Sequence, residues 1–218
     1  MKKLLLTAVM TFGLGFIGFV ATANATLVFN LGGCDFSSDP GGTGTCGGSG
    51  ADLPDNALNM AFNQNGVDTV RLAIDADGMP DGTGKIKGIW FNVDNLNFSD
   101  LTFSYVSGVA TNDITPGGNV FGAVGIFDIN FEYKTSGPLG SLFYNKTSVY
   151  DISGTGLLEN DFNALSSGGY NAVMHVNITG NGESGHYVSP VPEPASMLLI
   201  GTGLVGIAGS RLRRRKKA

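Results

Sequence analysis

Apolar and polar residues alternate along most of the chain between residues 26 and 190, in short runs separated by glycine, asparagine, aspartate and serine. Alternation with a period of two is typical of strands that bury one face, and the polar clusters are typical of turns. The clearest run, from Ala172 to Ile178, places His175 and Asn177 between apolar residues. The pattern predicts eight strands, at residues 26–31, 58–62, 67–74, 86–93, 101–106, 120–133, 148–152 and 170–178.

Helical periodicity is confined to residues 157–165, which are long enough for only one or two turns. Strands and helices do not alternate along the chain, which argues against the parallel sheets of α/β proteins. The 165 residues of 26–190 suffice for one domain with a hydrophobic core. We therefore expect an all-β domain, an antiparallel β-sandwich that is either jelly-roll-like or immunoglobulin-like.

The first 25 residues have the order of a secretory signal peptide. Two lysines follow the initiating methionine, an apolar run occupies residues 4–20, and an Ala-Asn-Ala tripeptide ends the segment. This order is a charged start, an apolar middle and an A-x-A cleavage site. We expect signal peptidase to recognise Ala23 and Ala25, so that the mature chain begins at Thr26. The alternative is an uncleaved N-terminal anchor.

The last 28 residues, 191–218, have three parts. A hinge that cannot continue a helix or a strand comes first, formed by Val191, Pro192, Glu193 and Pro194. Residues 195–210 follow without a charge, and a basic tail (211–218) ends the chain with Arg211, Arg213, Arg214, Arg215, Lys216 and Lys217. As a helix, the 16 uncharged residues extend roughly 24 Å, less than the ~30 Å hydrocarbon core. We expect a marginal single transmembrane helix with its basic tail in the cytoplasm.

The sequence VPEPASMLLIGTGLVGIAGSRLRRRKKA at residues 191–218 resembles the PEP-CTERM sorting signal in all three parts and in their order. The tripeptide of that family corresponds to Pro192, Glu193 and Pro194. The resemblance implies an exosortase, a membrane protease that removes the tail and passes the protein on to the outer surface or an exopolysaccharide matrix. It therefore implies an inner-membrane-anchored precursor and a final place at the cell surface or outside the cell. A plain single-pass anchor is the alternative.

Charge distinguishes the middle of the chain from its ends. Residues 26–190 contain five basic and 17 acidic residues, which gives a formal net charge of −12. No basic patch is available to neutralise phosphates, so a nucleic-acid partner is not expected. An acidic surface instead keeps an exported domain soluble, attracts divalent cations, or does both.

Three aspartates, Asp75, Asp77 and Asp81, are the candidate metal ligands, because Asp-x-Asp-Gly opens many calcium loops. The EF-hand template fails at Met79 and Ile86, where it requires ligands. The segment is then either an acidic turn between strands or a looser calcium loop completed by backbone carbonyls. Calcium is the one cofactor that the sequence suggests.

Cys34 and Cys46 are the only cysteines, and glycines flank both. In an oxidising compartment such a pair is typical of a disulfide that closes a small loop, and we expect that bond here. A metal site would need further ligands, and neither His175 nor His186 is nearby in sequence.

The chain lacks the G-x-S-x-G and H-E-x-x-H motifs of common hydrolases, so we expect a non-catalytic protein. We expect His175 to be a satisfied surface or core residue and His186 to be solvated. Trp90 lies between Ile89 and Phe91, so we expect it in the core.

The leading hypothesis is an exported surface or extracellular-matrix protein associated with exopolysaccharide or biofilm. Its expected partners are signal peptidase, an exosortase-type protease, the membrane through the C-terminal helix, and exopolysaccharide. The alternative is a secreted carbohydrate-binding module or a glycan-active enzyme that uses carboxylates, although no spacing in the sequence nominates a catalytic pair.

Overall fold

The computed structural model describes residues 26–33, 53–82, 84–120, 124–136, 140–178 and 184–189. These residues form ten β-strands and two short 3-10 helices, which confirms the predicted all-β character. The strands are β1 (Thr26–Gly33), β2 (Leu53–Gln64), β3 (Thr69–Asp75), β4 (Gly84–Phe91), β5 (Thr102–Gly108), β6 (Asp113–Pro116), β7 (Ile129–Glu132), β8 (Thr147–Ser153), β9 (Ala172–Ile178) and β10 (Ser184–Val188). The helices are η1 (Phe98–Asp100) and η2 (Glu159–Asn163).

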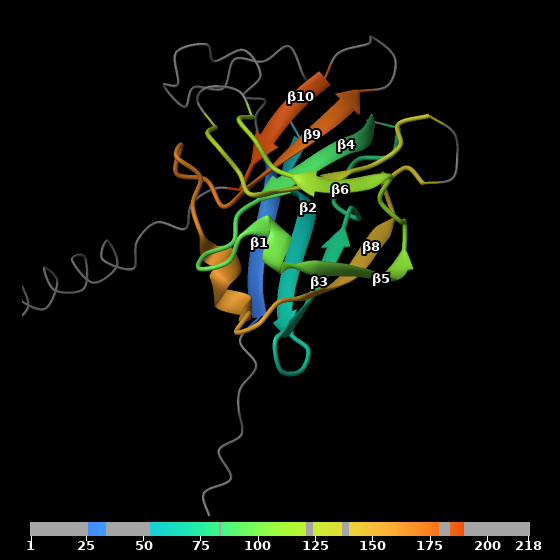
Figure 1. Ribbon diagram of the computed structural model, residues 1–218. Helices are drawn as coiled ribbons and strands as arrows, with labels where there is room; N and C mark the ends of the chain where they lie inside the picture. The colour runs from blue at the N-terminus through green and yellow to red at the C-terminus, as the bar shows by residue number, and fades with distance from the viewer. Residues whose placement is uncertain are drawn as a thin grey trace, which may run out of the picture.

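The strands form two antiparallel sheets of five strands each (Figure 1). The first sheet has the order β1-β2-β3-β8-β5, and the second sheet has the order β10-β9-β4-β7-β6. Strands that follow one another in sequence often lie in different sheets, as β4 and β5 do. The chain therefore passes repeatedly between the sheets and joins them into one unit.

The core lies between the two sheets, where aromatic rings from both sides meet. Phe62 of β2 and Phe91 of β4 have ring centroids 5.7 Å apart in an edge-to-face arrangement. Phe103 of β5 and Phe131 of β7 make a second such contact, also at 5.7 Å. Aromatic pairs favour this geometry, which adds to the stabilisation from burial. The two sheets are therefore packed face to face, as the sandwich prediction requires.

Alternation along the central strands explains which side chains enter this core. In β3, Val70, Leu72 and Ile74 are fully buried, whereas Arg71 and Ala73 between them are only half-buried. Successive side chains of a strand point to opposite faces, so the apolar set faces the other sheet. The periodic pattern at residues 67–74 thus predicted both the strand and its buried face.

The strand predicted at residues 120–133 is wrong over most of its length, because only its end forms a strand, β7. The described residues before β7 form two paired arms of a hairpin, in which the amide of Phe127 donates to the carbonyl oxygen of Gly118 (3.1 Å). Gly125 has a φ of +95°, a conformation that side-chain-bearing residues rarely adopt. The apolar residues of this segment therefore belong to a hairpin and not to one extended strand.

Three shorter elements also differ from the sequence expectation. The two strands β6 and β10 were not predicted, because they are short and contain proline or glycine. The helical segment predicted at residues 157–165 is reduced to the 3-10 helix η2. Phe162 of η2 is fully buried and stacks on Phe62 at 4.5 Å, so this segment closes one part of the core.

Several predictions concern residues outside the described part of the chain. These are the signal peptide (1–25), the disulfide between Cys34 and Cys46, and the tail (191–218) with its transmembrane helix at 195–210. Within the described ranges, none of the helices combines the length and the apolar character needed to cross a bilayer.

Candidate functional site

A row of polar and aromatic residues crosses the outer face of the second sheet. His186 of β10 is the register partner of His175 of β9, which is paired with Gly88 of β4. Gly88 is paired in turn with Glu132 of β7. Register partners on neighbouring strands point to the same face, so these residues lie side by side across four strands.

A second row lies two residues away on each of these four strands and continues onto β6. Its register partners are, in order, Val188, Val173, Trp90, Asn130 and Thr115 of β6. The side toward β10 is apolar and the side toward β6 is polar, with Trp90 at the boundary. The outer face therefore offers both kinds of contact within a short distance.

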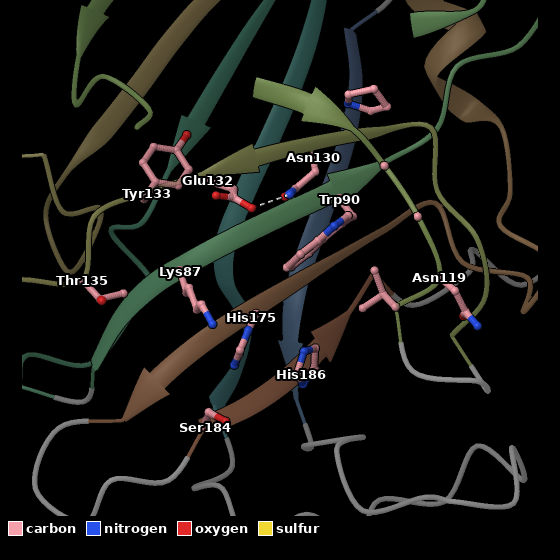
Figure 2. Close-up of a pocket in the computed structure, with 14 residues that line it drawn as sticks. Lys87, Trp90, Asn119, Asn130, Glu132, Tyr133, Thr135, His175, Ser184 and His186 are labelled. Carbon is pink, nitrogen blue, oxygen red and sulfur yellow. Dashed lines mark hydrogen bonds between the residues drawn. The ribbon is translucent and has the colours of Figure 1, made fainter. Parts of the chain in front are cut away.

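Three aromatic rings are stacked across these rows, as Figure 2 shows. The ring centroids of His175 and His186 are 4.2 Å apart with an interplanar angle of 24°. The rings of Trp90 and His175 are 6.5 Å apart at 28°. His186 is only 3% exposed, so the prediction that it is solvated is wrong. It forms the end of the stack because β10, which was not predicted, pairs with β9.

Trp90 lies on the outer face and not in the core, contrary to the prediction. Ile89 and Phe91 on either side of it are fully buried, so strand alternation turns Trp90 outward, where it is half-buried. A Cβ atom on Gly88 would lie 2.5 Å from Cη2 of Trp90. The missing side chain at Gly88 therefore leaves the space that the indole ring occupies.

The two described arms of the hairpin, residues 117–120 and 124–127, cover the apolar side of this face. Side chains of the hairpin and of strands β9 and β10 together form a second, smaller apolar cluster. Its buried members are Val120, Val124, Phe127, Val173 and Val188. The hydroxyl of Ser166 donates to the carbonyl oxygen of Val124 (2.6 Å), and the amide of Ile126 donates to Oγ of Ser167 (3.2 Å). These bonds hold the hairpin against the loop that precedes β9.

A groove with a volume of about 520 Å³ lies between this hairpin and the polar rows (Figure 2). Its size is within the ~300–1,000 Å³ range of small-molecule sites. Trp90, Asn130, Glu132, His175 and His186 line it. Further polar lining comes from Lys87, Asn119, Thr135 and Ser184.

Asn130 lines the groove and carries a buried hydrogen-bond acceptor. Its Nδ2 donates to Oε1 of Glu132 (3.1 Å) and to Oγ1 of Thr115 (3.3 Å). A carboxylate only accepts hydrogen bonds, so the contact with Glu132 fixes which end of the amide is the nitrogen. Oδ1 of Asn130 is buried and has no hydrogen-bond partner among the described residues, and the residue is 6% exposed. The Asn130 oxygen is therefore a buried acceptor that no described residue satisfies.

Lys87 and Glu132 are the two charged side chains of the lining, and both residues are exposed. Their charges are opposite, so the lining has no net formal charge when the histidines are neutral. Glu132 is the sole carboxylate among the lining residues. A second carboxylate, that of Asp113 on β6, is the register partner of Glu132 and lies outside the lining.

Tyr133 also borders the groove, but its hydroxyl belongs to the core. It donates to Oγ of Ser148 at 3.0 Å, and Ser148 donates to the carbonyl oxygen of Val109 at 2.7 Å. Burial raises the pKa of the Tyr133 phenol above its usual value. Figure 2 shows the hydroxyl directed away from the other labelled side chains, so this group supplies no proton to the groove.

The structure does not bring the candidate calcium ligands together. Asp75 ends β3, and its Oδ1 accepts a hydrogen bond from the amide of Asp77 (3.0 Å), which forms a local turn. Asp81 follows on an exposed part of the loop before β4. In the ranges that the structure describes, no group of three or more His, Cys, Asp or Glu side chains is arranged to hold a metal ion.

The remaining predicted sites concern the ends of the chain. Thr26, the expected first residue of the mature protein, is also the first residue of β1. Ala23, Ala25 and the sorting motif with its basic tail lie outside the described residues. Sequence reasoning did not identify Lys87, Asn130 or Glu132, whose proximity depends on strand pairing.

The fold and the groove describe an all-β domain. The C-terminal residues that follow this domain indicate how the protein is sorted. The family profile of the PEP-CTERM protein-sorting motif matches residues 190–215. The chain therefore carries a PEP-CTERM sorting motif, which confirms the resemblance of its C-terminal residues. Comparison with curated proteins gave no match, and comparison with solved structures gave none.

Proposed function

We propose that this chain is an exported surface or extracellular-matrix protein that an exosortase-type system sorts and that associates, without catalysis, with exopolysaccharide or biofilm. The observation that carries the proposal is the PEP-CTERM motif at residues 190–215. A motif of this kind implies a membrane-anchored sorting signal and a processing protease. The β-sandwich before it is then the part that is displayed.

The proposed processing begins with cleavage by signal peptidase before Thr26. The C-terminal helix at residues 195–210 would then hold the precursor in the inner membrane, with the basic tail in the cytoplasm. An exosortase-type protease would act at the motif that begins with Val191. The first and last strands of the chain are compatible with both cuts, because β1 starts at Thr26 and β10 ends at Val188. Neither cleavage would remove a residue from a sheet.

A binding role for the displayed domain is favoured over a catalytic one by the composition of its groove. The lining offers aromatic rings, amides and hydroxyl groups, and Glu132 is its single carboxylate, with Asp113 next to Glu132 but outside the lining. These features support a carbohydrate-binding module more than a carboxylate-dependent glycan-active enzyme, the two forms of the alternative hypothesis. The proposed fold of this displayed domain is a jelly-roll-like or immunoglobulin-like β-sandwich.

The sorting proposal is tested by separating the motif from the anchor. Replacement of Pro192, Glu193 and Pro194 with alanine leaves the apolar segment and the basic tail intact, so membrane insertion should persist while processing stops. The comparison variant replaces the six basic residues after Ser210 with serine, which should weaken retention, because a ~16-residue segment has little hydrophobic surplus. Immunoblots of cell fractions from the native host report mass and location. If the triple-alanine variant is processed like wild type, the motif is only a linker and the sorting proposal is wrong.

A further inference from the structure

We propose that the groove on the outer face of the second sheet binds a neutral saccharide, with Trp90 as the contact for a sugar ring and Oδ1 of Asn130 as an acceptor for a sugar hydroxyl. This inference rests on the proposed display of the domain among extracellular polysaccharides. It adds the site and the chemical class of the ligand.

The aromatic side of the argument is the position of Trp90 in the ring stack. His175 lies against one side of the indole, at a centroid distance of 6.5 Å. The order of the strands places His186 beyond His175 and leaves the other side of Trp90 toward β7. The C–H groups on one side of a pyranose form an apolar surface, which favours contact with an aromatic ring in a partly buried site. Trp90 is half-buried, and it lines the groove.

The polar side of the argument is the mixture of donors and acceptors around this ring. Asn130 is more than nine-tenths buried, and its Oδ1 has no partner among the described residues. An acceptor left unsatisfied in a buried position is costly, and a hydroxyl group of a ligand would satisfy it. Lys87 and Asn119 supply donors from other parts of the lining. Sugar hydroxyls both donate and accept, so they match such a mixed lining.

Charge selects a neutral saccharide over an acidic one. Lys87 and Glu132 have opposite charges, so the lining does not offer a net positive charge to an acidic sugar. The whole segment 26–190 has a formal net charge of −12, which repels a polyanion. A neutral chain avoids this repulsion and still uses the aromatic and hydroxyl contacts.

The chain contains a single tryptophan, so its own fluorescence reports on the proposed site. The probes are oligosaccharides from a partial hydrolysate of the host's exopolysaccharide, divided by anion exchange into neutral and acidic fractions. The full chain in mild detergent is titrated with each fraction. We expect a saturable change in Trp90 emission with the neutral fraction, unaltered when the salt concentration is raised about tenfold, because no charge pairing is involved. Binding of the acidic fraction alone, or of neither fraction, would overturn the proposal.

Variants place the binding in the groove. Calorimetry should show an affinity about 30-fold or more lower for Trp90→Ala, as expected for a central aromatic contact. Asn130→Ala should lose about tenfold, because a sugar hydroxyl loses its acceptor. The matched control is Tyr105→Ala, which removes an aromatic residue that is 51% exposed on the edge strand of the first sheet. It should bind like wild type.

Circular dichroism shows which variants are folded, and only folded variants are compared. If Trp90→Ala does not fold, Trp90→Phe replaces it and should show a smaller but measurable loss. Wild-type affinity in folded variants of both Trp90 and Asn130 would place the saccharide elsewhere. That result leaves the sorting proposal untouched, because sorting is read from the mass and location of the protein in cells.

Discussion

The outer faces of the two sheets are built from similar strands but differ in how their polar side chains are hydrogen-bonded. On the first sheet, polar side chains pair with one another: Asn59 donates to Asn30 (2.8 Å), and Arg71 makes two 2.9 Å bonds to the carboxylate of Asp151. On the second sheet, Oδ1 of Asn130 has no partner among the described residues, and a hairpin forms a wall over the strands. The first face is closed by its own contacts, whereas the second leaves a site.

The reason for the difference lies in the side chains that the register brings together. On the first sheet, Arg71 and Asp151 are direct partners of opposite charge on β3 and β8. On the second sheet, large rings and apolar residues occupy one side of the face, which requires a cover to keep them from water. The cover is formed by the hairpin arms at residues 117–120 and 124–127, and the groove lies beside this cover. A groove thus arises where a sheet has an apolar outer side as well as a polar one.

The largest expected effect on stability is at the cover. Phe127 is 2% exposed in the second apolar cluster, and Phe127→Ala should lower the free energy of unfolding by about 3 kcal/mol, because a large buried side chain is lost. Denaturant titration measures this. The matched variant on the first face is Val28→Ala, at a residue 44% exposed, with an expected change within about 0.5 kcal/mol. Equal effects of the two variants would remove the distinction between the faces.

A smaller effect is expected under the tryptophan ring. Gly88→Ala places a Cβ atom 2.5 Å from Cη2 of Trp90, so the ring must move or the strand must shift. Overpacking of this kind costs about 1–3 kcal/mol, and the displaced indole should change its emission maximum. The control is Gly118→Ala, where the added carbon meets no atom within 4 Å. An unchanged spectrum for Gly88→Ala would show that the indole does not lie over Gly88.

The ion pair on the first face should matter less than either of these. The Arg71 guanidinium lowers the pKa of the Asp151 carboxyl through hydrogen bonds and charge. The pair therefore stabilises the fold above the pKa of an unfolded aspartate, and this contribution disappears as the pH falls through the lower folded-state pKa. The loss in Asp151→Asn, measured by thermal unfolding, should be present at neutral pH and absent in strong acid. The Arg71 and Asp151 side chains are 41% and 23% exposed, so solvent screens the pair. A difference that grows on acidification would contradict the assignment.

The smallest effect is expected for calcium. Asp75 already accepts a hydrogen bond within its own turn, and the described residues include no three-ligand group. Addition of calcium should therefore leave the midpoint of thermal unfolding unchanged in the full chain, whereas a ligand that binds the native state raises it. A concentration-dependent rise that Asp77→Asn abolishes would restore the calcium loop as a site.

Sequence periodicity predicted the central strands because their burial follows a simple alternation. The runs at 67–74, 148–152 and 170–178 overlap strands of the structure, β3, β8 and β9. The same reasoning failed at residues 120–133, because the apolar residues before β7 belong to a hairpin that packs on the second sheet. Their spacing therefore does not follow the alternation of a single strand. It also failed for β10, whose five residues include a glycine.

The groove was not predictable in the same way. Trp90 was predicted in the core, although alternation along β4 turns it outward because Ile89 and Phe91 occupy the buried positions. The sequence does not show that Asn130 of β7 is the register partner of Trp90. That proximity depends on the order of strands in the second sheet, which brings together segments distant in sequence. The sorting motif, by contrast, is contiguous, and its family resemblance was readable directly.

The most direct test of the account asks whether the second face holds the protein in the matrix. Strains of the native host that express wild type, Trp90→Ala or Tyr105→Ala are grown as biofilms, and matrix and medium are separated and immunoblotted. The account predicts that Trp90→Ala is exported and processed normally but shifts from the matrix to the medium, while Tyr105→Ala stays with the matrix like wild type. Equal retention of all three proteins in the matrix would contradict it.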